Sequence, residues 1–173
     1  MLIAFAGLPG TGKTTLARAI AEERRATYLR VDTIEQTLRD SGVLAGEVGP
    51  AGYMVAYALA SANLRLGQDV VADTVNPLAI TRDGWRNAAR AAGAAIVEVE
   101  VICSDAAEHR RRVETRIVDV PGLVPPSWEA VVTRAYDGWD RPHVVIDTAR
   151  RSVADALVEL RARLANPQAI SER

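Results

Sequence analysis

The sequence predicts an α/β fold, an open sheet of parallel strands with helices on both faces. Two observations support this prediction. Short apolar runs rich in β-branched residues alternate along the chain with longer segments whose apolar residues recur every three or four positions, the period of an amphipathic helix. The segments between the apolar runs are also long enough to hold the helical crossovers that parallel strands require. In such a sheet, ligands bind beyond the carboxyl ends of the strands.

The expected strands follow one another in a regular order. They are the apolar runs at residues 2–6, 27–31, 69–73, 95–103 and 143–147. The helical period is plainest in residues 13–25 and 152–164. Two segments interrupt the alternation, the glycine-rich residues 41–52 and the proline-rich residues 118–126. Each could be a mobile lid over a site or a plain surface connection.

Composition limits the class of protein. The chain has 173 residues, 49% of them hydrophobic, which suffices for one self-sufficient domain over residues 1–173. Its formal net charge of −1 lacks the positive excess of a dedicated duplex-DNA binder. The single cysteine, Cys103, permits no intramolecular disulfide and fits a reducing, cytoplasmic location. The apolar start is too short for a signal segment or a membrane span, so no membrane partner is expected.

The segment after the first expected strand carries the most specific motif of the chain. It matches G-x-x-x-x-G-K-[ST] between a strand and a helix, the context that this phosphate-binding motif requires. Its residues are Gly7, Leu8, Pro9, Gly10, Thr11, Gly12, Lys13 and Thr14, followed by Thr15. The glycines let the backbone turn tightly and point its N–H groups inward, at the positive end of the following helix. The motif predicts a site for a polyphosphate.

Two side chains of this motif have predicted roles of their own. Lys13 is the only lysine among 21 basic residues, and it stands where a compact charge on a flexible stem can reach the β- and γ-phosphates. Thr14 would offer its hydroxyl to Mg²⁺, which binds a few protein oxygens together with phosphate. The alternative, a glycine-rich turn without chemical function, does not explain the full motif in its strand-to-helix context.

Asp32 follows the second expected strand and has two possible roles. Its carboxylate could accept the proton of a substrate hydroxyl that attacks the γ-phosphate, and so act as a general base. Alternatively, Asp32 could cap the helix that follows, with Glu35 completing a capping box three residues later. Spacing alone favours neither role.

Asp73 ends the third expected strand, which is otherwise apolar. A carboxylate at that position could hold Mg²⁺, often through water, or orient the acceptor. Asn76, in the loop that follows, could cap the next helix.

Arginines supply the next candidates. Arg112 and Arg116 are one helical turn apart and directly precede the proline-rich segment, so they could fold over the transferred phosphoryl group. The alternative is a solvated face balanced by neighbouring glutamates. The stripe Arg82, Arg86 and Arg90 on another helix is interpreted as surface, with phosphate binding as the alternative.

The remaining aromatic and histidine residues are less specific. Apolar and aromatic residues from Trp128 to Trp139 fall at helical spacing, which favours a core-facing stripe. Tyr53 and Tyr57 could face an acceptor molecule. The histidines have no metal-ligand spacing, so no zinc site is expected.

Together, these features resemble the small P-loop kinases, the nucleoside-monophosphate-kinase-like group. The resemblance rests on the phosphate-binding motif, "RVDTIE" after the second strand, "ADTVNP" after the third, the paired arginines and "VVIDTA" near the end. It is closest to the kinase domain of polynucleotide 5′-hydroxyl kinases, and looser to shikimate-kinase-like, chloramphenicol-phosphotransferase-like and zeta-toxin-like enzymes.

The resemblance implies a P-loop NTPase fold, three layers α/β/α with a five-stranded parallel sheet in the order 2-3-1-4-5 and a helical lid at about residues 105–126. It also implies ATP as donor, Asp32 as the base, Arg112 and Arg116 as lid arginines, and Asp147 and Thr148 near the adenine.

One departure from the family's pattern bears on the substrate. Polynucleotide kinases carry an arginine three residues after the base, and this chain has Glu35. The leading hypothesis is therefore an ATP- and Mg²⁺-dependent kinase acting on a hydroxyl of a small molecule. A polynucleotide 5′-hydroxyl kinase is the alternative, and a non-kinase nucleotide-binding or hydrolysing switch is the third possibility.

Overall fold

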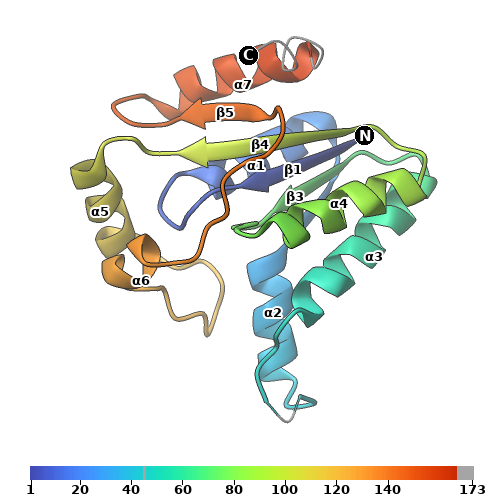
Figure 1. Cartoon of the computed structure of the whole chain (residues 1–173), viewed down its shortest axis with the longest axis horizontal. Helices are drawn as coiled ribbons and strands as arrows, with labels where there is room; N and C mark the ends of the chain where they lie inside the picture. The colour runs from blue at the N-terminus through green and yellow to red at the C-terminus, as the bar shows by residue number, and fades with distance from the viewer. Residues whose placement is uncertain (45, 167–173) are drawn as a thin grey trace.

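Five parallel strands form the centre of the computed structural model, which describes residues 1–44 and 46–166. The strands are β1 (Leu2–Ala6), β2 (Thr27–Arg30), β3 (Val70–Asp73), β4 (Ile96–Ile102) and β5 (Val144–Asp147). They pair in the order β2-β3-β1-β4-β5, so the predicted order is confirmed (Figure 1). Each expected strand is found within one or two residues of its predicted bounds.

Helices cover both faces of this sheet. They are α1 (Lys13–Arg24), α2 (Val31–Asp40), α3 (Ala51–Arg65), α4 (Ala79–Ala91), α5 (Ala106–Thr115), α6 (Trp128–Val132) and α7 (Val153–Ala165). Helices α1 and α7 pack on one face and α3 and α4 on the other, which gives three layers (Figure 1). In the described part of the chain, no helix is both long and apolar enough to cross a membrane.

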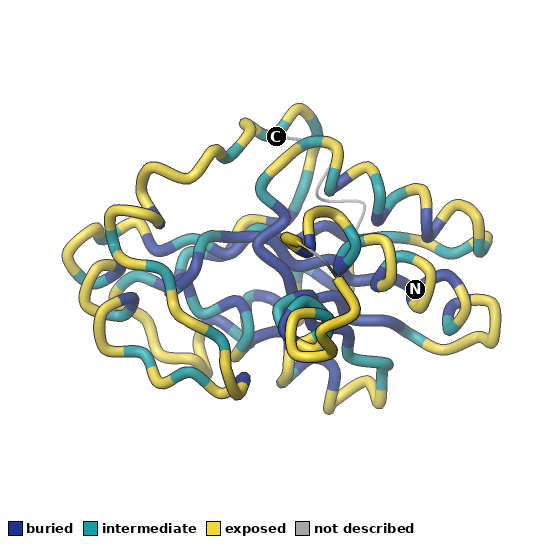
Figure 2. Tube along the Cα trace, turned by 90° about the horizontal axis from the view of Figure 1, so that it is seen from below, coloured by how far each residue is buried: buried dark blue, intermediate teal, exposed yellow. Residues whose placement is uncertain are grey.

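The two cores follow from the alternation of side chains along buried strands. All five residues of β1 are fully buried, as Figure 2 shows for the centre of the sheet. Ile3 and Phe5 join the core under α1 and α7, while Leu2 and Ala4 join the core under α3 and α4. A central parallel strand is apolar on both faces because helices cover both, and this accounts for the unbroken apolar run.

The carboxyl ends of the strands meet at one edge, beside α5 and α6 (Figure 1). In the register between β2 and β3, Arg30 lies opposite Asp73, and β1 runs next to β3. The phosphate-binding loop after β1, Asp32 after β2 and Asp73 at the end of β3 are therefore brought to the same edge of the sheet.

The interpretation of Arg82 as a surface residue is wrong. Its side chain is fully buried, and its guanidinium donates to the carbonyl oxygens of Asn76, Pro77, Asp137 and Gly138 at 2.6–3.2 Å. These bonds join the loop after β3 to the segment after α6. Helical spacing could not reveal this role, because the four carbonyls come from segments distant in sequence.

The prediction of helical structure from Trp128 to Trp139 is also wrong. Helix α6 ends at Val132, and the aromatic residues beyond it lie in an irregular segment. The Tyr136 and Trp139 rings lie 5.2 Å and 4.2 Å from the Arg82 guanidinium carbon, and the Tyr136 hydroxyl donates to Glu100. These contacts require a chain path that wraps around Arg82, which a continuous helix could not follow.

Candidate active site

The phosphate-binding loop has the backbone that its motif predicts. Gly7, Gly10 and Gly12 have φ values of 132°, 85° and 93°, a region that side-chain-bearing residues rarely adopt. Gly12 precedes α1 and no side chain caps this helix, so its first N–H groups face the loop. The loop therefore has the form of an anion-binding nest.

Two side chains from outside the motif contact backbone carbonyl groups of the loop. The Thr148 hydroxyl donates to the Thr11 carbonyl at 2.8 Å, and His109 Nε2 lies 2.8 Å from the Pro9 carbonyl. Because these bonds occupy carbonyl oxygens of the loop, they support the inward direction of its N–H groups. No sequence pattern predicted this role for His109, which comes from α5.

Lys13 is buried beneath this loop. Burial lowers the pKa of its ammonium group, and the negative charges of Asp73 and Asp32 partly offset that effect. Lys13 and Thr14 line a cavity of about 560 Å³, here called the loop cavity, together with Arg112 and Arg116. A polyphosphate in the loop cavity would compensate the buried charge of Lys13.

A cavity of about 290 Å³, the distal cavity, shares Gly12, Thr15 and Arg112 with the loop cavity. Thr148 also lines the distal cavity. Asp147 instead accepts backbone N–H groups of Ser104 and Ala149. Burial alone would raise the pKa of Asp147, but these hydrogen bonds and the Arg151 charge together lower it. Of the two residues expected near an adenine, Thr148 faces the distal cavity and Asp147 shapes the turn beside it.

Asp32 does not cap α2, so the capping alternative is wrong. The helix begins at Val31, its N-cap is Arg30, and no side chain makes a capping bond there. Asp32 is 30% exposed and lines two cavities. One is an apolar cavity of about 480 Å³, and the other is a junction cavity of about 390 Å³ that it shares with Lys13 and Arg116.

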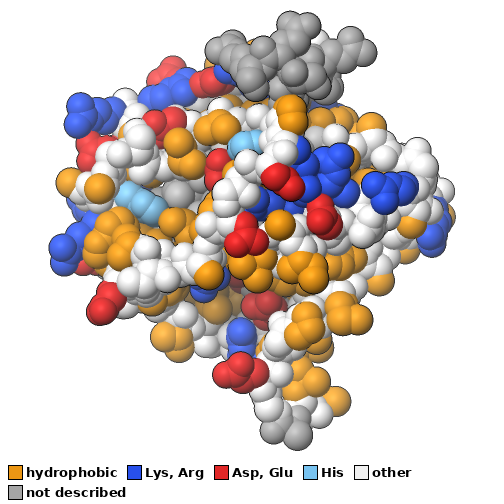
Figure 3. Space-filling model, viewed as in Figure 1, with side chains coloured by type: hydrophobic (Ala, Val, Ile, Leu, Met, Phe, Trp, Pro, Cys, Tyr) orange, Lys and Arg blue, Asp and Glu red, His pale blue; other side chains and the backbone are white. Residues whose placement is uncertain are grey.

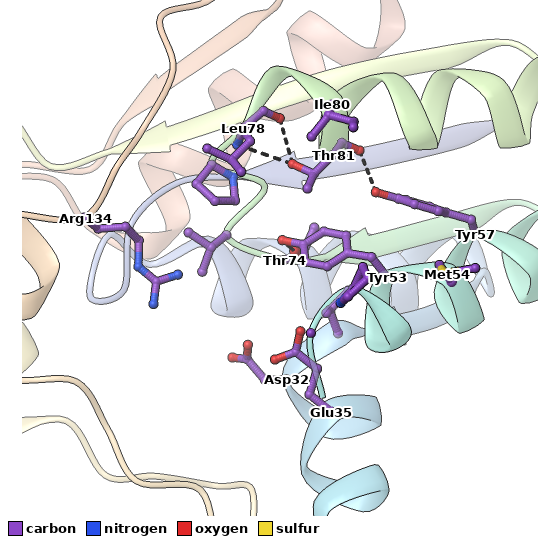
Figure 4. Close-up of a pocket in the computed structure, with 15 residues that line it drawn as sticks. Asp32, Glu35, Tyr53, Met54, Tyr57, Thr74, Leu78, Ile80, Thr81 and Arg134 are labelled. Atoms are coloured by element: carbon purple, nitrogen blue, oxygen red, sulfur yellow. Dashed lines mark hydrogen bonds between the residues drawn. The ribbon is translucent and has the colours of Figure 1, made fainter. Parts of the chain in front are cut away.

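Figure 4 shows the side chains that line the apolar cavity. Asp32 and Glu35 extend from α2 below Tyr53, and the Asp32 carboxylate turns toward the side from which Arg134 approaches on another segment. Tyr57 also lines this cavity, so both tyrosines expected to face an acceptor do lie along one space. Arg134 lines both the apolar and the junction cavity, and no sequence pattern pointed to it.

Arg30 is a buried arginine that lies between three carboxylates. It is not among the site residues that the sequence predicts. Its guanidinium nitrogens lie 3.8 Å from Asp32 Oδ2, 3.7 Å from Asp73 Oδ2 and 2.8 Å from Asp119 Oδ1. Only 7% of the Arg30 side chain and 1% of Asp73 are exposed, so these two charges compensate each other away from solvent, while Asp32 and Asp119 are 30% and 40% exposed. Arg30 ends a strand whose apolar pattern gave no reason to single it out.

The surroundings of the two Asp73 carboxylate oxygens bear on the predicted role of this residue as a magnesium ligand. It is 1% exposed, and Oδ2 accepts the Tyr28 hydroxyl at 2.7 Å. Oδ1 is buried with no hydrogen-bond partner among the described residues. Within those residues, no group of three or more His, Cys, Asp and Glu side chains could hold a metal alone. The unpartnered Oδ1 is an oxygen of the kind that Mg²⁺ takes from one or two protein ligands, together with phosphate oxygens and water.

Asn76 does not cap α4. Its backbone has a φ of 50° and its N–H donates to the Tyr53 hydroxyl at 3.1 Å, while the N-cap of α4 is Leu78. Asn76 instead helps to fix Tyr53 in the wall of the apolar cavity.

Arg112 and Arg116 do not share a helical face as expected. Helix α5 ends at Thr115, and Arg116 has an extended backbone. Arg112 is held in place, donating to the Thr148 hydroxyl at 2.8 Å and to Glu108 at 2.6 Å. The two arginines nevertheless line the loop cavity together, and Arg116 also reaches the junction cavity.

Glu35 gives the fold a predictable pH dependence. Burial, reinforced by the Asp32 charge, raises the pKa of the Glu35 carboxyl. Folding thus favours the protonated acid, and the stability that it confers is lost as pH rises through the folded pKa. Glu35→Gln mimics the protonated acid. We expect its melting temperature to equal that of the wild type at pH 4 and to exceed it at pH 8. Melting curves at both pH values test this, and a wild-type advantage at pH 8 would contradict it.

Comparison with known proteins agrees with this geometry. A family model described as an AAA domain matches residues 2–125, well over half of the chain. The protein Rv2004c of Mycobacterium tuberculosis is 51% identical over 43 residues, which are 25% of this chain and 9% of that protein. The match therefore spans about a tenth of the length of that relative.

Solved structures show the same fold. The APS kinase CysC of Mycobacterium tuberculosis, in complex with AMPPNP and APS, superposes with a TM-score of 0.71 at 18% identity, over 95% of this chain and 96% of that one. A gluconokinase of Sinorhizobium meliloti 1021 gives a TM-score of 0.65 at 22% identity, over 95% and 91%. The strand order, the phosphate-binding loop and the family match place the chain in the AAA domain family, with the fold of the small P-loop kinases.

Proposed function

We propose that this protein is a kinase that transfers the γ-phosphate of ATP to a hydroxyl group of a small molecule. The observation that carries the proposal is the position of Asp32, which lines the apolar cavity and also the junction cavity beside Lys13. A hydroxyl of a molecule in the apolar cavity would meet Asp32 before it meets the phosphate. Its proton would pass to Asp32 as the oxygen attacks the γ-phosphorus, and the bond from that phosphorus to the β–γ bridging oxygen would break to release ADP.

The nucleotide would extend along the loop and distal cavities. The uncapped N–H groups at the start of α1, in residues 12–15, and the Lys13 side chain would bind its phosphates, with the base beside Thr148 in the distal cavity. Thr14 and Asp73 would hold Mg²⁺, and Asp73 offers the unpartnered Oδ1 for a direct or water-mediated contact. Magnesium, when bound, neutralises charge on the phosphate oxygens.

Arg112 and Arg116 would stabilise charge on the transferred group. Arg116 lines the junction cavity with Lys13 and Asp32, where the transferred phosphoryl group would lie. Arg112 is already fixed by Thr148 and Glu108, so it would act without reorganisation.

We further propose that the lid lies at about residues 105–126, as the resemblance implies, and that Asp119 fastens the part of it that follows α5. The Asp119 carboxylate pairs with Arg30 at 2.8 Å and with Arg18 on α1. We expect Asp119→Asn to weaken both pairs and to make trypsin cleave after Arg116 several-fold faster, since cleavage requires local opening. A time course of limited proteolysis measures this rate. Asp140→Asn, at another exposed ion pair, is the matched control, and equal cleavage of the two variants would contradict the proposed role of Asp119.

A transfer assay tests the proposed activity. The protein is incubated with Mg²⁺ and γ-labelled ATP, against nucleosides, aminoglycosides and oligonucleotides in separate pools. We expect label in a small-molecule pool, and none with Lys13→Met. Label in oligonucleotides, falling steeply with salt, would favour the polynucleotide alternative. ATP hydrolysis that no acceptor alters would favour the switch.

A further inference from the structure

The apolar cavity is large enough for a whole small molecule. Its volume of about 480 Å³ lies within the usual range for ligand pockets. Much of its wall is apolar, including Met54 on α3 and Ile80 on α4, whose side chains are 64% and 75% exposed. Figure 3 shows hydrophobic side chains gathered over α3 and the segment before it. A bound molecule with an apolar body would cover such groups.

The hydroxyl groups in the wall are already engaged by the protein. The Tyr57 hydroxyl donates to the Thr81 carbonyl at 2.8 Å, and the Thr81 hydroxyl donates to the Leu78 carbonyl at 2.7 Å. The Tyr53 hydroxyl accepts from Thr74 at 2.6 Å. The tyrosines therefore present mainly ring surface to a ligand. The Tyr53 hydroxyl, which accepts from Thr74 and from the Asn76 N–H, keeps its own proton to donate, and the charged side chains left for polar contacts are Asp32, Glu35 and Arg134.

Glu35 is seated with little freedom beside Asp32. The two carboxylates come from positions i and i+3 of α2, which places them on the same side of the helix. A Cβ atom added at Gly52 on α3 would lie 2.3 Å from Glu35 Cγ. Glycine at position 52 thus makes the room that this side chain occupies.

The charges around the cavity disfavour anions. The one basic residue in its lining is Arg134, which is exposed, whereas two carboxylates line the same space. Asp32 and Glu35 each have an arginine nearby, Arg30 at 3.8 Å and Arg39 at 3.5 Å, but neither arginine lines this cavity. A phosphate or carboxylate on the acceptor would therefore approach the carboxylate oxygens before it reached either guanidinium. Hydroxyl or ammonium groups would instead donate to the two carboxylates.

Resting on the proposed function, we propose that the acceptor is a non-anionic alcohol with an apolar body and a second donor group next to the reacting hydroxyl. The reacting hydroxyl faces Asp32, the neighbouring donor binds Glu35, and the apolar body lies along Tyr53 and Tyr57. Glu35 is then the residue that selects for the second donor group.

Matched probes test this selection by binding alone. Calorimetry in the presence of Mg²⁺ and AMPPNP compares 3-phenyl-1,2-propanediol with 3-phenylpropan-1-ol, which lacks the second donor, and with 3-phenyllactate, which is anionic. We expect the diol to bind about tenfold more tightly than either, the value of one hydrogen bond to a charged group. Without its apolar body, 1,2-propanediol should bind more weakly still.

Two variants assign the preference to Glu35. Glu35→Gln removes the charge, and Gly52→Ala pushes the Glu35 side chain aside while favouring helix α3. Each should reduce the advantage of the diol over the mono-alcohol to about twofold or less. Glu114→Gln, on the exposed face of α5, should leave it unchanged.

Three results would overturn the proposal. They are binding of 3-phenyllactate as tight as that of the diol, an unchanged diol advantage in Glu35→Gln, and no binding of either aryl alcohol at millimolar concentration. Phosphorylation of an anionic acceptor would overturn it while the proposed kinase function stands. Glu35-dependent binding of the diol without phosphoryl transfer to any hydroxyl compound would instead count against the kinase function and leave the binding preference intact.

Discussion

Asp32→Asn is expected to reduce phosphoryl transfer by about 10²–10⁴-fold while nucleotide affinity stays within about twofold of wild type. The amide has nearly the shape of the carboxylate but cannot take up the proton of the attacking hydroxyl. Asp32 makes no capping bond, and its nearest ion pair is the 3.8 Å contact to Arg30. The substitution should therefore leave the fold intact.

The measurement pairs two assays on the same variant. Labelled ATP and the acceptor found by screening give the transfer rate, and calorimetry with Mg²⁺ and AMPPNP gives the dissociation constant. Asp40→Asn is the matched control, since Asp40 ends the same helix and accepts a hydrogen bond only from Gln36 among the described contacts. Transfer by Asp32→Asn at the wild-type rate would exclude Asp32 as the base.

Arg82→Met is expected to lower the free energy of unfolding by about 3–5 kcal/mol, because it removes the donor from several buried carbonyl groups. The carbonyls of Asn76 and Pro77, and those of Asp137 and Gly138, would lose their shared partner. Arg82→Lys should recover little of this loss, since one ammonium group cannot reach the four acceptors of a planar guanidinium.

Urea denaturation of the two variants measures the loss. Arg90→Met is the matched control, because Arg90 lies on the same helix, is exposed and donates only to Asn87 among the described contacts. It should change the free energy of unfolding by no more than about 0.5 kcal/mol. A loss below about 1 kcal/mol in Arg82→Met would mean that Arg82 does not hold the two segments together.

How well each site residue could be predicted depends on whether its role is decided within one short stretch of the sequence. Residues 7–15 form a loop whose glycines, lysine and threonine act within one continuous stretch, so the motif predicted its backbone. Asp32 was ambiguous because capping and base chemistry need the same residue at the same spacing, and only the observed start of α2 at Val31 removed capping. Arg112 and Arg116 lie close to their predicted place, but only Arg112 is helical. Helix α5 ends at Thr115, one residue before Arg116, whose backbone is extended.

Several residues of the site could not be found in the sequence at all. Arg30 ends an ordinary strand, and its three carboxylate neighbours include Asp119, which is 89 residues away along the chain. Arg134 lies beyond a helix that proved shorter than expected, and His109 reaches a loop 100 residues before it. Each role depends on a partner that the chain brings close only when folded.

By itself, the sequence determined the parallel strands and the phosphate-binding loop, because strand burial, helical period and glycine backbone are properties of short segments. The order of the strands was predicted only through the resemblance to the small P-loop kinases. Only the tertiary structure decided which charged side chains gather at the carboxyl edge, which ones become buried, and which cavities Asp32 joins. The physical reason is that burial and charge pairing depend on distances between segments far apart in the chain, and no local pattern records those distances.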